Sequence, residues 1–561
     1  MKNNLLIIIL FIYNFNYSQT TSFENKKTEN LIQIWGILKY KHPNISRGNI
    51  DFDNQFLKEL EKIKLLKTQE QLNSEFIKWI NSFDSKKEKI KIKASQSDKL
   101  FTKNEDYSWI TNSNFNDELV ELLNQIKSNT NYGKYYAFVN KMSSIVDFNN
   151  DKEFVNFNIK KEGHRLLFLA SFWNKMRYWN VNIYLTETKW NKVLQNIIPD
   201  FFNANNLSKF GLAKDKLFAS LNDSHSNYNF SALYNNPKRK HSLYGGRIIN
   251  DTLVIKTIFN SHFANEENIE LNDLIYSING KKLKHYLNKK FLNRISVSNK
   301  NRLKASLESF LLLSSTSSDS LKIGVLKKNG VVREQKIKLY KFSKKNFKPE
   351  RLIDTLSIIK WKNIKQGIGY INLKKINKSE LKKAFKSFKN TKGIIIDLRN
   401  YPTNLKATDV PYFLYPKKKV FIKILSSDGP AIGKYDTQSA LKIFKNPFAA
   451  GRGNKNYYKG KVILLVDRNT GSMAEYFAMA IQNSPNCITI GEQTFGAVMN
   501  RTEVVLKDKT KIDFTGLGSF YPNDLNVQRQ GLKINYKVKE KAKGNNIYEY
   551  IDKAIKIIQE N

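Results

Sequence analysis

The stretch Lys461-Val-Ile-Leu-Leu-Val-Asp-Arg-Asn-Thr-Gly-Ser-Met-Ala-Glu-Tyr-Phe-Ala-Met-Ala-Ile-Gln482 decides the fold. Its first part is apolar, rich in β-branched residues and of strand length, whereas the residues after Ser472 follow the amphipathic period of a helix. The stretch therefore predicts a buried strand, a tight turn and a helix, with Ser472 at the junction. Strands and helices alternate around it from about Leu356 onward, which predicts an α/β core with a mostly parallel sheet.

Ser472 has two interpretations. Together with Glu475, three residues later, it matches a helix capping box, in which the serine hydroxyl accepts from the first backbone N–H groups of the helix. A serine in this place also has its hydroxyl at the end of a buried strand, beside N–H groups that can hold a developing oxyanion. This stretch alone favours the cap, so the choice depends on the rest of the chain.

The cysteine count and the N-terminal segment indicate where in the cell the protein is located. The chain has 561 residues, enough for three or four domains, and a single cysteine, Cys487, so no intrachain disulfide can form. Residues 1–18 have the short positive start and apolar run of a secretory signal, and no other segment reaches transmembrane length. We therefore expect an exported bacterial protein, located in the periplasm or cell envelope or secreted, without an integral membrane span once the signal is removed.

A net charge of +44 makes nucleic acid a candidate partner, because basic side chains bind the phosphate backbone. The lysines are spread through every segment, however, and no groove-reading motif, zinc finger or stacking platform accompanies them, so we expect no nucleic-acid binding. Attraction to an anionic cell surface or to acidic polymers stays open.

The region from residue 22 to about 235 is predicted to be mainly helical and contains a faint repeat. Ile34–Pro43 is echoed by Phe172–Asn180, and each is followed by a second helix. The simplest interpretation is two related helical hairpins whose aromatic side chains lie in the core.

Short strands follow, from Leu243 to about Phe342. The segment from Leu271 to Leu283, which contains Ser-Ile-Asn-Gly-Lys, resembles the strand and turn of PDZ domains. That family binds extended peptides at a sheet edge, so the resemblance implies either peptide binding or a module that orients its neighbours.

A serine nucleophile needs a base, and of six histidines His225 is the best candidate. It lies where an amphipathic helix ends in a polar turn that can aim the imidazole outward. Four motifs then occur in the order and type of the C-terminal processing peptidases and tricorn-core serine peptidases, which the chain resembles. They are Leu221–His225, Gly393–Asn400, Thr470–Glu475 and Gly491–Gly496.

The resemblance implies a multidomain α+β protein with a ClpP/crotonase-like core. The implied parts are a signal peptide (1–18), a helical N-terminal region with the His-bearing turn (19–235), a PDZ-like domain (240–345), an α/β serine peptidase core (350–545) and a C-terminal helix (546–561). It also implies an exported serine endopeptidase that hydrolyses peptides or unfolded protein through an acyl-enzyme, with no metal or organic cofactor. The oligomeric state is not indicated.

The resemblance also implies roles for single residues. One branch of the family uses a lysine base, but Ala497 occupies that position here. The tricorn-like branch uses a Ser-His pair, which Ser224 and His225 match. Ser472 would then attack the carbonyl, His225 would take and return the proton, and Ser224 would help to hold the ring, with Asp223 as the competing candidate.

Two departures from the family bear on activity. Gln528 stands where the tricorn-like branch has a glutamate, so any stabilisation of the imidazolium would lack a charge. Met473 supplies one oxyanion N–H, but Thr403 and Asn404 stand where the family has two glycines for the other. The alternative function is therefore a catalytically impaired envelope protein that binds peptides.

Overall fold

The computed structural model describes residues 23–83, 101–129, 132–140, 142–227, 237–291, 293–308, 312–343, 347–352, 359–427, 435–437, 448–542 and 546–560. The expected signal peptide, residues 1–18, lies outside the described residues. Among the residues that are described, no helix is both long and apolar enough to cross a membrane. The chain forms two compact units, and the expected mixed, multidomain α+β architecture is confirmed.

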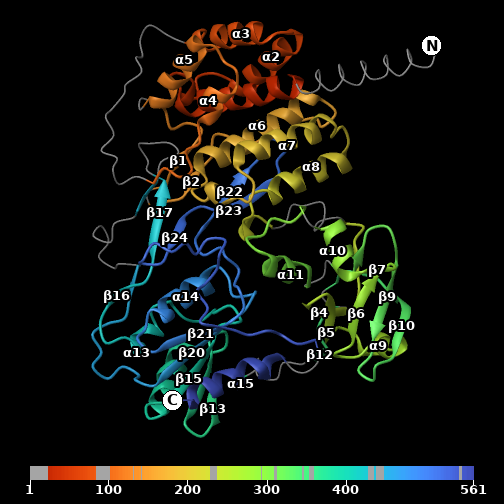
Figure 1. Cartoon of the computed structure of the whole chain (residues 1–561), viewed down its shortest axis with the longest axis vertical. Coiled ribbons are helices and arrows are strands. Elements are labelled where there is room, and N and C mark those ends of the chain that lie inside the picture. Colours follow the sequence, from red (N-terminus) through yellow and green to blue (C-terminus); the bar gives the residue numbers. More distant parts are fainter. Residues whose placement is uncertain are drawn as a thin grey trace, which may run out of the picture. The chain divides into compact units, whose positions relative to one another are not determined.

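The first unit comprises residues 1–221, 425–437 and 501–517. It is mainly helical, and Figure 1 shows α6, α7 and α8 side by side in it. Its elements are a helix over 23–41, η1 (Ile45–Arg47), α2 (Phe52–Leu65), α3 (Gln69–Asn81), α4 (Ser108–Asn112), α5 (Asp117–Ser128), α6 (Glu162–Trp179), η2 (Ile183–Leu185), α7 (Trp190–Phe202), α8 (Leu207–Ala219), and the strand pairs β1 (Phe138–Val139) with β2 (Val146–Asp147) and β22 (Arg501–Val505) with β23 (Lys511–Thr515).

The predicted repeat is visible in this unit as two helix, 3-10 turn, helix units. In the first, the Trp35 indole N–H donates to the Phe52 carbonyl at 2.9 Å, and the two rings are nearly parallel. In the second, the Trp173 indole N–H donates to the Trp190 carbonyl at 3.0 Å, again with nearly parallel rings. Both tryptophans of the first helices are buried, so these aromatic side chains belong to the core, as expected.

The hairpin formed by β22 and β23 belongs to this helical unit, although the sequence pattern assigns it to the α/β core. The reason is its apolar face: Val504, Leu506, Ile512 and Phe514 are buried in the same core as the helices. The two strand-like runs at 503–506 and 511–514 predict a hairpin, but they do not indicate which core the hairpin joins.

Buried charges also hold this hairpin. Lys507, just after β22, places its Nζ 2.7 Å from Asp151 Oδ1, and Lys39 Nζ lies 2.9 Å from the same oxygen. Lys175 donates to the Asp151 carbonyl, and burial lowers the pKa of Lys175 to about 7, although the nearby Asp151 charge opposes this. Asp151 thus compensates several buried ammonium groups at once.

The second unit comprises residues 222–424, 438–500 and 518–561. Its first part is the strand-rich module, defined here as residues 237–352. The module has a seven-stranded sheet around β5 and β6 and a three-stranded sheet in the order β11-β3-β8. Its elements are β3 (Lys240–His241), β4 (Tyr244–Ile249), β5 (Thr252–Ile258), α9 (Ser261–Glu266), β6 (Leu274–Ile278), β7 (Lys281–Lys282), α10 (Leu283–Lys290), α11 (Lys300–Glu308), β8 (Ser314–Ser315), β9 (Ser320–Leu326), β10 (Val332–Lys338), β11 (Tyr340–Lys341) and β12 (Arg351–Leu352).

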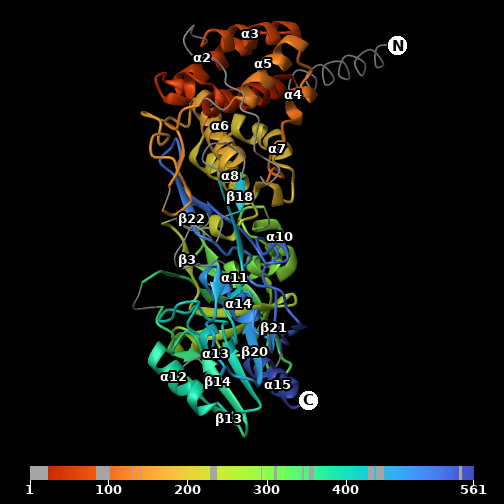
Figure 2. The ribbon, with the colours of Figure 1, turned by 90° about the vertical axis from the view of Figure 1, so that its left-hand side faces the viewer.

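The core of the second unit is a six-stranded sheet in the order β13-β14-β15-β20-β21-β25. All neighbours are parallel except the edge strand β13, in agreement with the predicted mostly parallel sheet. Figure 2 shows α12 beside the β13–β14 end of the sheet. The elements are β13 (Trp361–Lys365), β14 (Ile368–Asn372), α12 (Lys378–Ser387), β15 (Gly393–Asp397), α13 (Pro411–Leu414), β20 (Lys461–Val466), α14 (Met473–Gln482), β21 (Cys487–Gly491), β25 (Tyr536–Lys537), α15 (Asn546–Gln559) and the short strands β16 (Lys419–Val420), β19 (Ala449–Ala450) and β24 (Gly518–Phe520). The strand β18 (Tyr435–Thr437) and most of β17 (Lys423–Ser427) belong to the first unit.

Candidate active site

The candidate residues gather at the carboxyl edge of the parallel sheet. Strands β15, β20 and β21 are neighbours in register, so the segments that follow them emerge on the same edge. Open α/β sheets bind ligands outside the carboxyl ends of their strands. Ser472 lies on this edge because the turn after β20 leads directly into α14.

Ser472 has a backbone conformation that the cap interpretation does not predict. Its φ is 52° and its ψ is −120°, and its side chain makes no capping hydrogen bond to α14. An N-cap serine normally has extended backbone and accepts from the helix, so the side-chain cap interpretation is wrong here. A non-glycine residue at such a φ costs about 1–3 kcal/mol, and conformations of this kind cluster at functional sites.

The start of α14 offers donors beside the Ser472 hydroxyl. The Ala474 N–H donates to the Gly471 carbonyl at 3.0 Å, and the Tyr476 N–H donates to the Ser472 carbonyl at 3.1 Å. The Met473 N–H, at the first helical position, has no acceptor within the helix. The positive end of the helix dipole adds to the effect of the Met473 N–H, so negative charge next to Ser472 would be stabilised.

Glu475 keeps the bond to the Ser472 backbone that its capping-box position suggests, and it also binds residues outside α14. Its fully buried carboxylate accepts from the Thr494 hydroxyl at 2.6 Å, from the Gly496 N–H at 2.8 Å and from the Ala497 N–H at 3.0 Å. Burial raises the pKa of Glu475 to about 7, although these hydrogen bonds act to lower it. Glu475 thereby ties α14 to residues 494–497, which we call the 494–497 loop.

The turn that carries His225 is tied to the same loop. The Ser224 hydroxyl donates to the Phe495 carbonyl at 2.9 Å, so its described contacts fix the turn rather than the imidazole. The Asp223 carboxylate accepts from the His225 backbone N–H at 3.0 Å. The His225 ring lies 5.8 Å from the Phe495 ring, between centroids.

Phe495 links the two halves of the candidate site. Its N–H donates to the Thr470 carbonyl at 2.9 Å, two residues before Ser472. Its ring lies directly against Gly471, since a Cβ placed on that glycine would be 2.3 Å from the ring. One aromatic ring therefore contacts both the residue before Ser472 and the imidazole of His225. The structure thus brings Ser472, His225 and Ser224 to the same loop.

Gln528 is buried, next in the chain to a residue that bonds the 494–497 loop. It is 1% exposed, and the N–H of its neighbour Arg529 donates to the Gly496 carbonyl at 2.8 Å. Thr403 is exposed, and its hydroxyl donates to the Lys374 carbonyl at 3.4 Å.

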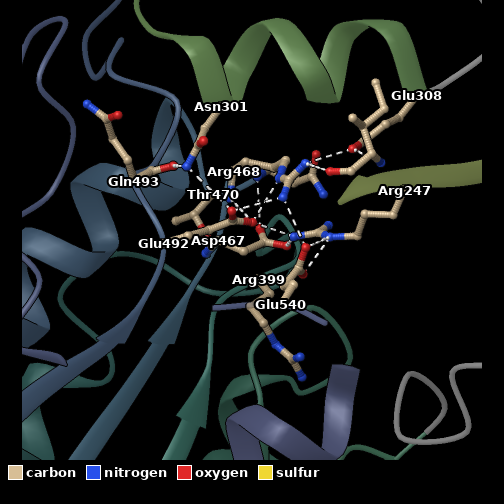
Figure 3. Close-up of polar contacts among 12 residues, drawn as sticks. Arg247, Asn301, Glu308, Arg399, Asp467, Arg468, Thr470, Glu492, Gln493 and Glu540 are labelled. Atoms are coloured by element: carbon tan, nitrogen blue, oxygen red, sulfur yellow. Dashed lines mark hydrogen bonds and ion pairs between the residues drawn. The ribbon is translucent and has the colours of Figure 1, made fainter. Parts of the chain in front are cut away.

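A buried ion network surrounds the turn after β20 (Figure 3). Arg468 lies between Glu492, at 2.8 Å, and Glu308 of the strand-rich module, at 2.7 Å. Arg247, also of the module, pairs with Glu492 at 2.5 Å and with Asp467 at 3.2 Å. Burial raises the pKa of Asp467, although Arg247 opposes this. The network holds the start of the Ser472 turn against the module.

Sequence reasoning missed Phe495, and it missed Ser296 and Ser298, whose hydroxyls accept from the N–H groups of Asp223 and Ser224 in the turn of His225. Phe495 belongs to a motif that marked its segment as part of the site, but nothing in that motif indicates that its ring contacts histidine. Ser296 and Ser298 lie in a connection between α10 and α11 and carry no local signal of function. In the part of the chain that the structure describes, no three or more His, Cys, Asp or Glu side chains are grouped to hold a metal ion.

The region of the parallel sheet is similar to known serine peptidases. The model of a family described as peptidase family S41 matches residues 367–538. The chain is 24% identical over 173 residues to the chloroplastic C-terminal processing peptidase of Tetradesmus obliquus, and 26% identical over 181 residues to a probable CtpA-like serine protease of Staphylococcus haemolyticus. These matches cover 30% and 31% of this chain and 34% of each relative. The chain thus spans about a third of the length of the curated relatives it matches.

Among solved structures, mature CPAF complexed with lactacystin is similar with a TM-score of 0.54 at 11% identity, over 70% of this chain and 96% of that chain. A crystal structure of mature CPAF gives the same TM-score and identity over 95% of its chain. At this identity the likeness concerns the fold.

Proposed function

Because the chain belongs to peptidase family S41 through residues 367–538, we propose that it is a serine endopeptidase acting on peptides or unfolded protein, with Ser472 as its nucleophile. The observation that carries the proposal is the contact of Phe495 with both His225 and Gly471, together with the positive φ of Ser472. Acyl transfer needs a serine at the junction of a buried strand and a helix and a base near it. Here the Phe495 ring contacts both the residue before Ser472 and the imidazole of His225.

In the proposed reaction, the Ser472 hydroxyl attacks the peptide carbonyl while His225 takes its proton. His225 then gives the proton to the leaving amine, and an acyl-enzyme forms on Ser472. Water then attacks the acyl carbonyl while His225 takes its proton, and His225 returns this proton to Ser472 Oγ as the ester bond breaks and the second product leaves. No metal or organic cofactor takes part in these steps.

The remaining residues have supporting roles in this proposal. The contacts of Ser224 and Asp223 support their holding the turn that carries His225. Gln528 takes the place of a glutamate and offers hydrogen bonds without charge. The Met473 N–H is one oxyanion donor, and the second is proposed at Thr403, whose loss would cost about 100- to 1000-fold in turnover.

We further propose that the strand-rich module is PDZ-like, that the sheet region has a ClpP/crotonase-like core, and that the protein is exported to a bacterial envelope. The strand between β5 and β9, which ends in Ser277-Ile278 and a turn at Asn279-Gly280, supports the PDZ-like assignment. Whether the module binds peptides is tested directly by titrating an extended peptide into the Ser472→Ala variant.

Labelling with a fluorophosphonate tests the peptidase function. The wild type should be labelled at Ser472, as located by mass spectrometry, and should cleave dye-labelled casein, whereas Ser472→Ala and His225→Ala should do neither. The alternative, a catalytically impaired peptide-binding protein, is favoured by Gln528 in place of a glutamate. It would replace the enzyme function if the folded wild type bound peptide without being labelled.

A further inference from the structure

The strand-rich module supplies two serines that pack against the turn of His225. They lie between α10 and α11, far from that turn in sequence. The Asp223 N–H donates to the Ser296 hydroxyl at 3.0 Å, and the Ser296 hydroxyl donates to the Asp223 carbonyl at 2.9 Å. This pair fixes the backbone two residues before His225.

Ser298 makes the closer connection. The Ser224 N–H donates to Ser298 Oγ at 3.1 Å, and the Ser298 N–H donates to Ser224 Oγ at 3.0 Å. The two hydroxyl oxygens lie 2.9 Å apart, and the Ser298 hydroxyl also donates to the Gly496 carbonyl at 2.9 Å. Ser224 is 0% exposed and Ser298 is 4% exposed, so water does not compete for these bonds.

The 494–497 loop is therefore held from two sides. On the side of the nucleophile, Glu475 accepts from the N–H groups of Gly496 and Ala497. On the side of the base, the hydroxyls of Ser224 and Ser298 donate to the carbonyls of Phe495 and Gly496. The loop fixes the separation between these two sides, and Ser298 is the contact through which the module takes part.

We propose that Ser298 is a positioning residue: by bonding both Ser224 and Gly496, it couples the strand-rich module to the alignment of His225 with Ser472. This inference rests on the proposed function, because it assigns His225 the role of base. Ser298 touches neither substrate nor the reacting atoms. Its effect is transmitted through the Ser224 turn and the 494–497 loop.

The two bonds of Ser298 have unequal importance. The Gly496 carbonyl also accepts from the Arg529 N–H at 2.8 Å, so the loop keeps a donor when the Ser298 hydroxyl is removed. The buried Ser224 N–H, in contrast, loses the acceptor that Ser298 Oγ provides. The Ser298→Ala change should therefore displace the base more than the nucleophile. A misplacement of about 1 Å can cost about 100-fold in rate.

The test measures the rate of fluorophosphonate labelling at saturating probe and the probe concentration at half saturation, across pH. For Ser298→Ala we expect a maximal rate lower by about 10- to 100-fold with half saturation little changed, and a displaced midpoint of the pH profile. Ser298→Thr, which keeps a hydroxyl, should recover most of the rate. Ser318→Ala is the matched control, since Ser318 is an exposed serine of the same module.

A double-mutant cycle keeps the inference falsifiable if Ser298→Ala loses stability. The Ser224→Ala/Ser298→Ala variant should be little slower than the slower single variant, because both changes break one connection. A Ser298→Ala rate and pH profile equal to those of the wild type would overturn the role of Ser298 alone. A folded wild type that is not labelled at Ser472 would overturn this inference and the proposed function together.

Discussion

Glu475 should make the stability of the protein depend on pH in a defined direction. Burial raises its pKa from 4.5 to about 7. Its contribution to the free energy of unfolding is therefore fully present below pH 4.5 and is lost as pH rises through about 7. At about 1.4 kcal/mol for each pH unit between these two values, the loss amounts to about 3 kcal/mol.

The Glu475→Gln change removes this titration. The free energy of unfolding, measured by urea denaturation and circular dichroism, should fall between pH 4.5 and 8 more steeply in the wild type than in the variant. Glu380→Gln is the matched control, because Glu380 is the same helical position of α12 but caps that helix at the surface. A wild-type curve parallel to that of Glu475→Gln over this range would refute the reasoning.

Three further predictions concern strain, buried charge and the missing carboxylate. Ser472→Gly and Ser472→Ala should both abolish labelling. The glycine variant should be more stable in urea than the alanine variant by about 1–3 kcal/mol, because φ is 52° at this position. Equal stabilities would show that the turn is unstrained. Asp151→Asn should lower the free energy of unfolding by about 3–5 kcal/mol, because buried lysines lose their counter-charge. The control is Asp513→Asn: Asp513 forms an ion pair with the exposed Arg501, and its loss should lower the free energy of unfolding by less than about 1 kcal/mol. Gln528→Glu should raise the rate of casein hydrolysis roughly fivefold, because a hydrogen bond to a charged group is stronger than a neutral one by about 1 kcal/mol. An unchanged rate would mean that Gln528 does not act on His225.

The local elements could be predicted from the sequence because their signals are local. The strand, turn and helix around Ser472 follow from hydrophobic period, and the repeated helical hairpins follow from two similar aromatic segments. The polar turn also marked His225, through its place at the end of an amphipathic helix. All of these features depend on residues that are close in the chain.

The contacts that assemble the site could not be predicted in this way. The bond from Ser224 to Ser298 spans 74 positions and the bond from Ser224 to Phe495 spans 271. The bond of Glu475 to the Ser472 backbone follows from a local capping pattern, but its carboxylate also accepts from N–H groups of the 494–497 loop. The sequence contains the capping pattern but gives no sign of these distant donors.

The β22–β23 hairpin has a consequence for the order in which the chain can fold. Lys507 bonds Asp151 across 356 positions and Asp53 across 454, so the helical unit gains these bonds only after nearly all of the polypeptide has been synthesised. Contacts of such long range slow folding, because a large loop must close before they form. A nascent chain that ends before the hairpin should thus leave apolar helix surface uncovered, and the helical unit should not be obtainable as an isolated N-terminal fragment.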